Sequence, residues 1–179
     1  LGTDYVDLLY VHWPADPYDP ETTLGAFDAL YDAGKVRHVG VSNFEPDQLD
    51  TARAVLDAPL VANQVEMHPL LQQRELREYA RRHDLWLVAY CPVARNLVAD
   101  VPEVVTVAER HDVTPAQVSL AWLLSKERVV PIPKAASERH QRENLAARDL
   151  DLDDEDLERI DGIEREHRIV DREYAPWRR

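Results

Sequence analysis

The chain has 179 residues, 45% of them hydrophobic, which is enough for one domain with a buried core. Acidic side chains outnumber basic ones by 34 to 21, and the net charge of −13 argues against nucleic acid or an anionic membrane surface as a partner. Such an acidic coat with few lysines is typical of a salt-adapted cytoplasmic protein, in which ions screen the repulsion.

Other simple features narrow the class further. A single cysteine, Cys91, excludes an internal disulfide. No apolar run approaches the roughly 20 residues that a membrane-spanning helix needs. The sequence starts at Leu1, inside what reads as a helix-to-strand turn, and we take this as a sign that further sequence precedes it.

Predicted strands and helices alternate along the chain. Short apolar runs predict five strands, at Tyr5–Val11, Val36–Val41, Leu60–Val65, Leu85–Tyr90 and Val129–Ile132. Apolar residues at helical spacing, with capping residues, predict helices starting at Thr22 or Thr23 and at Pro46, then Arg74–His83, Pro102–His111, Ala116–Ser125 after the Thr114-Pro115 cap, Ser137 to about Arg148, and Asp153 through Ile160. Asp16–Pro20 and Cys91–Val101 read as loops, and Arg165–Arg179 as a charged tail. Five strand–helix alternations with short connections predict a parallel sheet covered by helices.

Polar side chains follow each predicted strand. They are His12, the pair Ser42-Asn43, Gln64, Tyr90 and Lys134. No GxGxxG or GxxxxGK[ST] motif occurs, so a Rossmann or phosphate-loop site has poor support. One polar group at each strand end is the pattern of a βα-barrel, which needs eight units and about 250 residues, whereas this chain supplies five units.

Each of these residues also has a purely structural interpretation. His12 could be satisfied by backbone at a strand end, and Ser42 with Asn43 could cap the next helix. Tyr90 could be a core residue with a solvated hydroxyl, and Lys134 an ordinary exposed helix start. The remaining histidines form no HxH or HExxH spacing, so a metal site has little support.

Several motifs together resemble the aldo-keto reductase family. They are LGTDYVDLLYVHWP, GKVRHVGVSNF, NQVEMHP, LVAYCPV, TPAQVSLAWLL and VVPIPKAASERHQREN, in the order and spacing of that family's strands four to eight. The resemblance is to the prokaryotic diketogluconate-reductase-like members in particular. It implies a single domain over 1–179 that forms a partial (β/α)8 TIM barrel, α/β in class, without strands one to three. It also implies reduction of a small-molecule aldehyde or ketone with NADPH or NADH.

The same resemblance assigns roles around the reacting carbonyl. His12 is implied as the catalytic residue that orients and polarises the substrate oxygen, and Trp13 as a wall of the substrate pocket. The Cys91–Val101 loop and the tail with Trp177 are implied as further parts of that wall. The resemblance also implies that the nicotinamide carboxamide, which needs both donors and acceptors, is bound by Ser42, Asn43 and Gln64. It implies that Tyr90 stacks on the nicotinamide ring.

On the adenosine side the resemblance is less complete. Lys134 is implied as a phosphate contact, and Glu143 with Asn144 as the adenine-side pair. The hydroxyl and arginine of NADPH-preferring members are replaced by Ala135 and His140, while Arg139 lies one position early; we therefore expect a modest preference for NADPH, or dual use with NADH.

Three functions compete at this point. The family's proton-donating tyrosine, with its lysine and aspartate, lies on strands that this chain lacks, and Tyr18 has no lysine beside it. The first hypothesis is therefore an N-terminally truncated oxidoreductase that is inactive alone. The second hypothesis is a non-catalytic nicotinamide-nucleotide-binding or regulatory fragment. An upstream strand carrying Asp, Tyr and Lys would favour the truncated oxidoreductase over this second hypothesis. The third hypothesis, a barrel hydrolase or lyase, has weak support, because no carboxylate pair appears at the predicted strand ends. We expect the full-length protein to be a monomer and the isolated chain to self-associate through open sheet edges.

Overall fold

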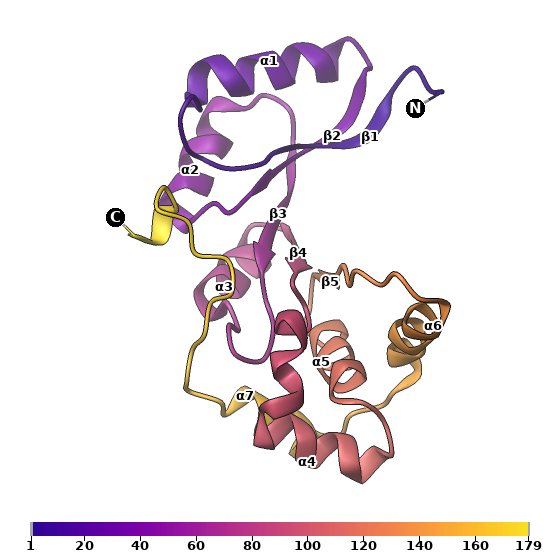
Figure 1. Cartoon of the computed structure of the whole chain (residues 1–179). Helices are drawn as coiled ribbons and strands as arrows, with labels where there is room; N and C mark the ends of the chain where they lie inside the picture. Colours follow the sequence, from indigo (N-terminus) through magenta and orange to yellow (C-terminus); the bar gives the residue numbers. More distant parts are fainter. Residues whose placement is uncertain (1, 179) are drawn as a thin grey trace. The chain divides into compact units, whose positions relative to one another are not determined.

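A computed structural model describes residues 2–178 (Figure 1). Its strands are β1 (Val6–Val11), β2 (Val36–Ser42), β3 (Leu60–Glu66), β4 (Trp86–Tyr90) and β5 (Val129–Pro131). Its α-helices are α1 (Pro20–Asp32), α2 (Pro46–Val55), α3 (Arg74–Arg82), α4 (Pro102–His111), α5 (Pro115–Leu124), α6 (Glu138–Ala146) and α7 (Asp154–Asp161). Three short 3-10 segments are η1 (Ala94–Asp100), η2 (Ala147–Asp149) and η3 (Pro176–Arg178).

The predicted alternation of strands and helices is confirmed. Each of the five predicted strands is present within one residue of its expected ends. The strands follow one another in the sheet in chain order, β1-β2-β3-β4-β5, and the two pairs β1–β2 and β2–β3 are parallel. This is an α/β sheet built from successive strand–helix units.

The chain divides into two compact units. The first takes in Leu1–Val65, Glu75–Leu87 and Asp171–Arg179, and the second takes in Glu66–Arg74 and Val88–Val170. Each unit is described by itself below.

The register of β1, β2 and β3 organises the first unit. Val11 pairs with Val41 across β1 and β2, and Ser42 pairs with Gln64 across β2 and β3. Because parallel strands end at the same edge, the residues that follow β1 and β2 are brought beside Gln64. Helices pack on these strands through fully buried side chains, among them Leu24, Val39, Val41, Phe44 and Leu49.

The start of one helix and the cap of another in this unit differ from the predicted ones. Helix α1 begins at Pro20, before the threonines, because Asp19 is the N-cap and its Oδ1 accepts the Thr22 amide at 2.9 Å. Pro at the first helical turn loses no hydrogen bond, so the earlier start costs nothing there. Helix α2 begins at Pro46 as predicted, but its cap is Glu45, whose capping box is closed by Gln48. The residues Ser42 and Asn43 therefore do not cap it.

The second unit is centred on α5. Thr114 caps this helix as predicted, and the residues Val118, Leu120, Trp122 and Leu123 are buried on all sides of it. Asp153 caps α7, also as predicted. The predicted loop Cys91–Val101 instead contains η1, interrupted by residues with left-handed backbone. No helix within residues 2–178 has the length and apolar character to cross a membrane.

Candidate functional site

The ends of β1, β2 and β3 are tied together by side chains. Ser42 and Asn43 are 2% and 3% exposed. The Ser42 hydroxyl donates to the Gln64 carbonyl at 2.7 Å, and the Asn43 Nδ2 donates to the His12 carbonyl at 3.1 Å and to Ser42 Oγ at 3.1 Å. The network joins three adjacent strand ends, and this replaces the capping interpretation of the Ser42-Asn43 pair.

The backbone of Asn43 adopts a conformation that favours asparagine. Its φ is 64°, in the left-handed region, where Asn is tolerated better than most residues. In this turn the Asn43 amide nitrogen also donates to the Gln64 carbonyl at 2.9 Å. Ser42 and Asn43 thus allow the chain to turn sharply at the end of β2 while both residues stay hydrogen-bonded to β3.

His12 and Gln64 present polar groups at this edge. The His12 carbonyl is held by Asn43 while its imidazole is exposed, and the Gln64 side chain is half-buried. An exposed imidazole can donate to an oxygen that gains negative charge, and a primary amide offers both a donor and an acceptor. The backbone of both residues is fixed, so their side chains stand on a rigid base.

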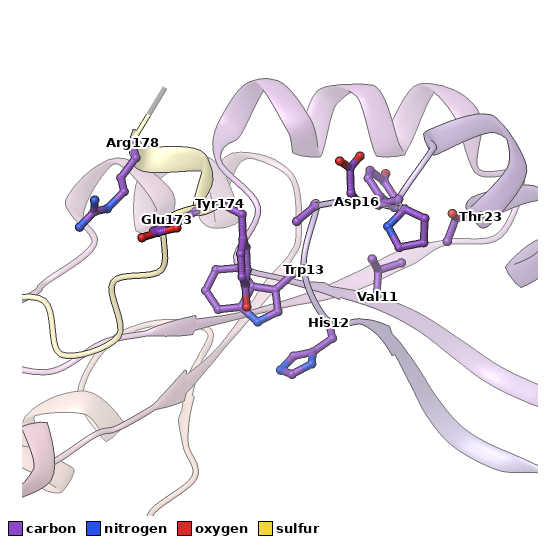
Figure 2. Close-up of a pocket in the computed structure, with 12 residues that line it drawn as sticks. Val11, His12, Trp13, Asp16, Thr23, Glu173, Tyr174 and Arg178 are labelled. Atoms are coloured by element: carbon purple, nitrogen blue, oxygen red, sulfur yellow. The ribbon is translucent and has the colours of Figure 1, made fainter.

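A cavity of about 740 Å³ opens beside His12 in the same unit (Figure 2). The rings of Trp13 and Tyr174 meet edge to face at 5.4 Å between centroids, and Trp177 lies 5.6 Å from Trp13. These contacts place the tail beside Trp13; Tyr174 belongs to the lining, whereas Trp177 contacts Trp13 without being among the described lining residues. The residues that line the cavity are Val11, His12, Trp13, Ala15, Asp16, Pro17, Tyr18, Thr23, Glu173, Tyr174, Ala175 and Arg178.

The resemblance implied the tail as part of the wall, but it did not single out the four tail residues that line the cavity, Glu173, Tyr174, Ala175 and Arg178. No motif or period links residues so far apart in the chain. Arg178 brings a guanidinium to the lining, and its Nε donates to Asp171 Oδ1 at 2.7 Å. Trp177 Nε1 donates to the same oxygen at 3.0 Å. Asp171 therefore folds the last turn back on itself, which presents Tyr174 to Trp13.

Tyr18 also lines the cavity. Burial, with a smaller contribution from the Asp19 carboxylate, raises its pKa to about 12. Its ring packs edge to face on Phe44 at 5.4 Å. A raised pKa makes the phenol a weaker acid, whereas a neighbouring lysine would lower the pKa and make the phenol a stronger one.

The second unit holds the residues predicted for the adenosine side. Asn144 is half-buried and lines a cavity of about 390 Å³ together with Ala135. Lys134 and His140 are exposed and are not among the lining residues. The Glu143 carboxylate accepts from Arg139 Nε at 2.7 Å, so this early arginine lies against Glu143.

Tyr90 in the same unit has a buried neighbour that the sequence did not single out. Burial, with the nearby Glu66 carboxylate, raises the Tyr90 pKa. The carboxylate of Glu66 is fully buried and accepts from His68 Nε2 at 3.0 Å and from the amides of Ile169 and Val170 at 2.5 and 2.7 Å. These bonds outweigh its burial and lower its pKa. The acidic residue inside NQVEMHP, directly after an apolar strand, was the available signal.

Within residues 2–178 no three His, Cys, Asp or Glu side chains gather in a way that could hold a metal ion.

The structure thus defines an α/β protein with polar residues gathered at the ends of parallel strands, and comparison with known proteins gives the family. Residues 1–165 match the Aldo/keto reductase family, and the chain belongs to it. The glyoxal reductase of Bacillus subtilis (strain 168) is 37% identical over 170 residues, which cover 94% of this chain and 60% of the relative. The 9,11-endoperoxide prostaglandin H2 reductase of Trypanosoma cruzi (strain CL Brener) is 36% identical over 173 residues, with the same coverage of 94% and 60%.

Solved structures show the same relationship. A protein provisionally described as a 2,5-diketo-D-gluconic acid reductase B is 37% identical with a TM-score of 0.92, over 97% of this chain and 62% of that one. The aldose reductase of Schistosoma japonicum is 28% identical with a TM-score of 0.85, over 97% and 65%. The predicted family and fold class are thus confirmed, as a partial TIM barrel. The chain spans about three fifths of the length of the curated relatives it matches.

Proposed function

We propose that this chain is part of a longer protein that reduces aldehydes or ketones to alcohols by hydride transfer from NADPH or NADH. The observation that carries the proposal is the tied edge of β1, β2 and β3, where His12, Asn43 and Gln64 stand together. The family membership and the names of the reductases above support it. The net charge of −13 supports a salt-adapted cytoplasmic protein.

The residues present fit a nicotinamide dinucleotide. The half-buried Gln64 amide can pair with a carboxamide, since each has one acceptor and two N–H donors. Ser42 and Asn43 use donors within the protein and hold the β3 end in place, so Gln64 is the amide turned to the ligand. On the second unit, Tyr90 offers a ring for stacking, Lys134 a cation for phosphate and Asn144 an amide for adenine.

His12 is the proposed catalytic residue. A nicotinamide cofactor, when bound, would supply a hydride for the carbonyl carbon, and negative charge would then develop on the substrate oxygen. The His12 imidazole, exposed at the cavity, would orient the substrate and donate a hydrogen bond to that oxygen. A proton must then reach the oxygen to give the alcohol. Trp13 would close the cavity behind the substrate.

A second candidate function is binding without catalysis. The observation that favours it concerns the proton: Tyr18, which lines the cavity, has a pKa raised to about 12. Of the lysines, Lys126 donates to Asp161 Oδ2 at 2.8 Å in the second unit. A lysine cation beside a phenol is what would make that phenol a better acid.

Two measurements on this polypeptide test the proposal. Titration with NADPH, followed by the fluorescence of the reduced ring, should saturate and should be reversed by NADP⁺. Turnover of a simple aldehyde should stay below about 1 per second, the low end for ordinary enzymes. Absence of saturable binding would contradict both candidate functions. A turnover at or above that rate, lost in His12→Phe, would reject the binding-only alternative.

A further inference from the structure

The cavity beside His12 carries charged groups around an aromatic wall. The rings of Trp13 and Tyr174 meet edge to face, and the carboxylates of Asp16 and Glu173 belong to the lining. Figure 2 shows Asp16 on the loop after β1 and Glu173 on the tail, to either side of these two rings. Because His12 is proposed to meet the carbonyl, these neighbouring groups are the ones that meet the rest of a substrate.

The guanidinium of Arg178 could offset these carboxylates, but Asp171 engages it. Arg178 Nε donates to Asp171 Oδ1 at 2.7 Å, and Arg178 Nη2 donates to Asp171 Oδ2. Trp177 Nε1 adds a third bond to Asp171 Oδ1 at 3.0 Å. The two arginine bonds occupy the edge of the guanidinium that would otherwise bind a ligand carboxylate. In Figure 2 the guanidinium is directed away from Trp13 and Tyr174.

With Arg178 held by Asp171, the lining carboxylates of Asp16 and Glu173 set the sign of the cavity. Carboxylates attract a cation and repel an anion. The electron-rich faces of Trp and Tyr rings add a cation–π attraction. The chain's net charge of −13 acts in the same sense at longer range. The cavity is therefore complementary to an ammonium group.

We propose that Asp171 is a specificity-determining residue. By holding the Arg178 guanidinium, it makes the cavity select carbonyl substrates that carry a cationic group, such as a quaternary or protonated amine, over substrates that carry a carboxylate. This inference rests on the proposed function, because it names the substrate class of the same site.

The test compares three benzaldehydes that differ in the para substituent, which is trimethylammonium, its neutral isostere tert-butyl, or carboxylate. Binding to the intact ¹⁵N-labelled chain is followed at the indole N–H signal of Trp13, whose ring lines the cavity. The wild type should bind the trimethylammonium compound about tenfold more tightly than the carboxylate. The tert-butyl compound measures the part of the affinity that does not depend on charge.

Variants assign this preference to the Asp171–Arg178 pair. In Asp171→Asn the released guanidinium should strengthen carboxylate binding about tenfold, the low end for a charge-assisted hydrogen bond, so that the ratio falls to about one. Adding Arg178→Met to that variant should cancel the gain. The control Glu21→Gln, exposed on α1 and not among the lining residues, removes the same charge and should keep the tenfold ratio.

The outcomes separate this inference from the proposed function. Equal binding of the two charged compounds by the wild type, or an unchanged ratio in Asp171→Asn, would overturn the inference. If Asp171→Asn also weakens tert-butyl binding, the tail has moved, and the double variant Asp16→Asn, Glu173→Gln decides, because a tenfold ratio retained there would overturn the inference.

Titration with NADPH tests the proposed function independently. Saturation by NADPH with no binding of any aldehyde would overturn the inference and leave dinucleotide binding standing. A tenfold preference for the cation without saturation by NADPH would support the charge selection and reject the proposed function.

Discussion

At the scale of single residues, hydrogen bonds hold polar groups together at the ends of β1, β2 and β3. The ends of three adjacent strands carry His12, Ser42, Asn43 and Gln64. The sequence could predict these positions, because a β-branched run followed by small polar residues indicates a strand end. Their individual roles stay predictions. The bonds among them explain why two of the four are buried, which a pattern of letters does not show.

Cofactor choice is a prediction at this scale. Lys134 is exposed, Ala135 offers no hydroxyl, and Arg139 is engaged by Glu143. The site therefore gives the adenosine 2′-phosphate less than a full set of charge-assisted bonds. We expect NADPH to bind about 10- to 100-fold more tightly than NADH, the value of one such bond.

Variants sharpen this prediction. His140→Arg should raise the ratio of dissociation constants, and Lys134→Met should bring it close to one. Lys35→Met, outside the proposed site, is the control. A wild-type ratio above about a thousandfold would show that more than one charge-assisted bond is made, against our placement.

Asp171 and Glu66 show why other residues escaped sequence reasoning. Asp171 lies in a tail that reads only as charged, and the structure is needed to show that its carboxylate holds Trp177 and Arg178. Glu66 is bonded to the amides of Ile169 and Val170, about a hundred positions away. No local period encodes such a distance.

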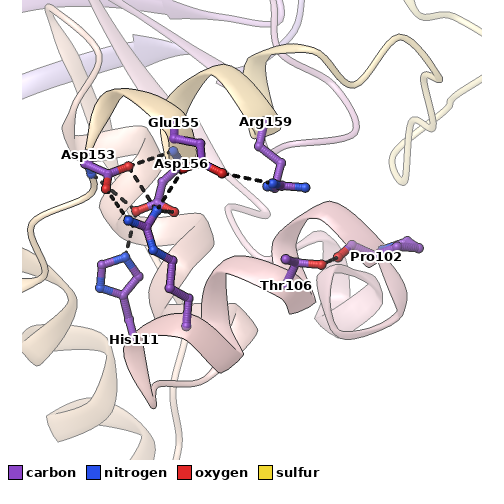
Figure 3. A network of polar contacts seen from close by, with 8 residues as sticks. Pro102, Thr106, His111, Asp153, Glu155, Asp156 and Arg159 are labelled. Atoms are coloured by element: carbon purple, nitrogen blue, oxygen red, sulfur yellow. Dashed lines mark hydrogen bonds and ion pairs between the residues drawn. The ribbon is translucent and has the colours of Figure 1, made fainter.

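At the scale of elements, α4 and α7 are joined by an ion cluster in the second unit (Figure 3). The carboxylate of Asp156, 1% exposed, accepts from Arg110 Nη1 at 2.8 Å and from His111 Nε2 at 2.6 Å. The sequence predicted Asp153 as the α7 cap but gave no sign of its bond to Arg110. Local capping is encoded locally, whereas this pairing depends on how two helices pack.

Asp156→Asn tests this cluster. The substitution removes a buried charge between two donors and turns an amide N–H toward the guanidinium. We expect a loss of about 1–3 kcal/mol in the free energy of unfolding, measured in urea, because Asp156 is buried while Arg110 and His111 stay partly hydrated. Asp154→Asn, exposed on the same helix, should change it by less than about 0.5 kcal/mol. Equal effects of the two substitutions would mean that the cluster contributes nothing.

The ion pair between Glu103 and Arg165 predicts a pH dependence. The Arg165 guanidinium lowers the Glu103 pKa from 4.5 to about 2. Because the folded-state pKa is depressed, the stabilisation is fully present above pH 4.5 and is lost as the pH falls toward 2. The pair is partly exposed, so its value is about 1 kcal/mol or less.

Thermal unfolding checks this. Glu103→Gln should lower the midpoint by a constant amount above pH 4.5, and the gap should close below it. Glu109→Gln, exposed on the same helix, should show no such closing gap. A gap between wild type and Glu103→Gln that stays constant from pH 6 to 3 would contradict the assignment.

At the scale of the whole molecule, the family and fold class were predictable because several motifs matched in order. The expected single domain over 1–179 stays a prediction, as does self-association. In the strand order β1 and β5 are the outermost strands, and an outer strand can recruit another chain unless it is covered.

The charge of the chain gives the prediction for the whole molecule. A net charge of −13 repels itself, and the screening length falls from about 10 Å at 0.1 M salt to about 3 Å at 1 M. The thermal midpoint should therefore rise between low and molar KCl. A midpoint that stays flat or falls would exclude salt adaptation.

The central claim is that the strand-end residues of the first unit bind the nicotinamide half of a dinucleotide. Saturation-transfer NMR on NADP⁺ with the intact chain tests it most directly, because it reports which ligand protons touch protein. We predict transfer to the nicotinamide H2 and to the adenine protons, both abolished by excess NADPH, with the nicotinamide signal reduced in Gln64→Leu. Transfer to the adenine protons alone, or to neither end, would contradict the claim.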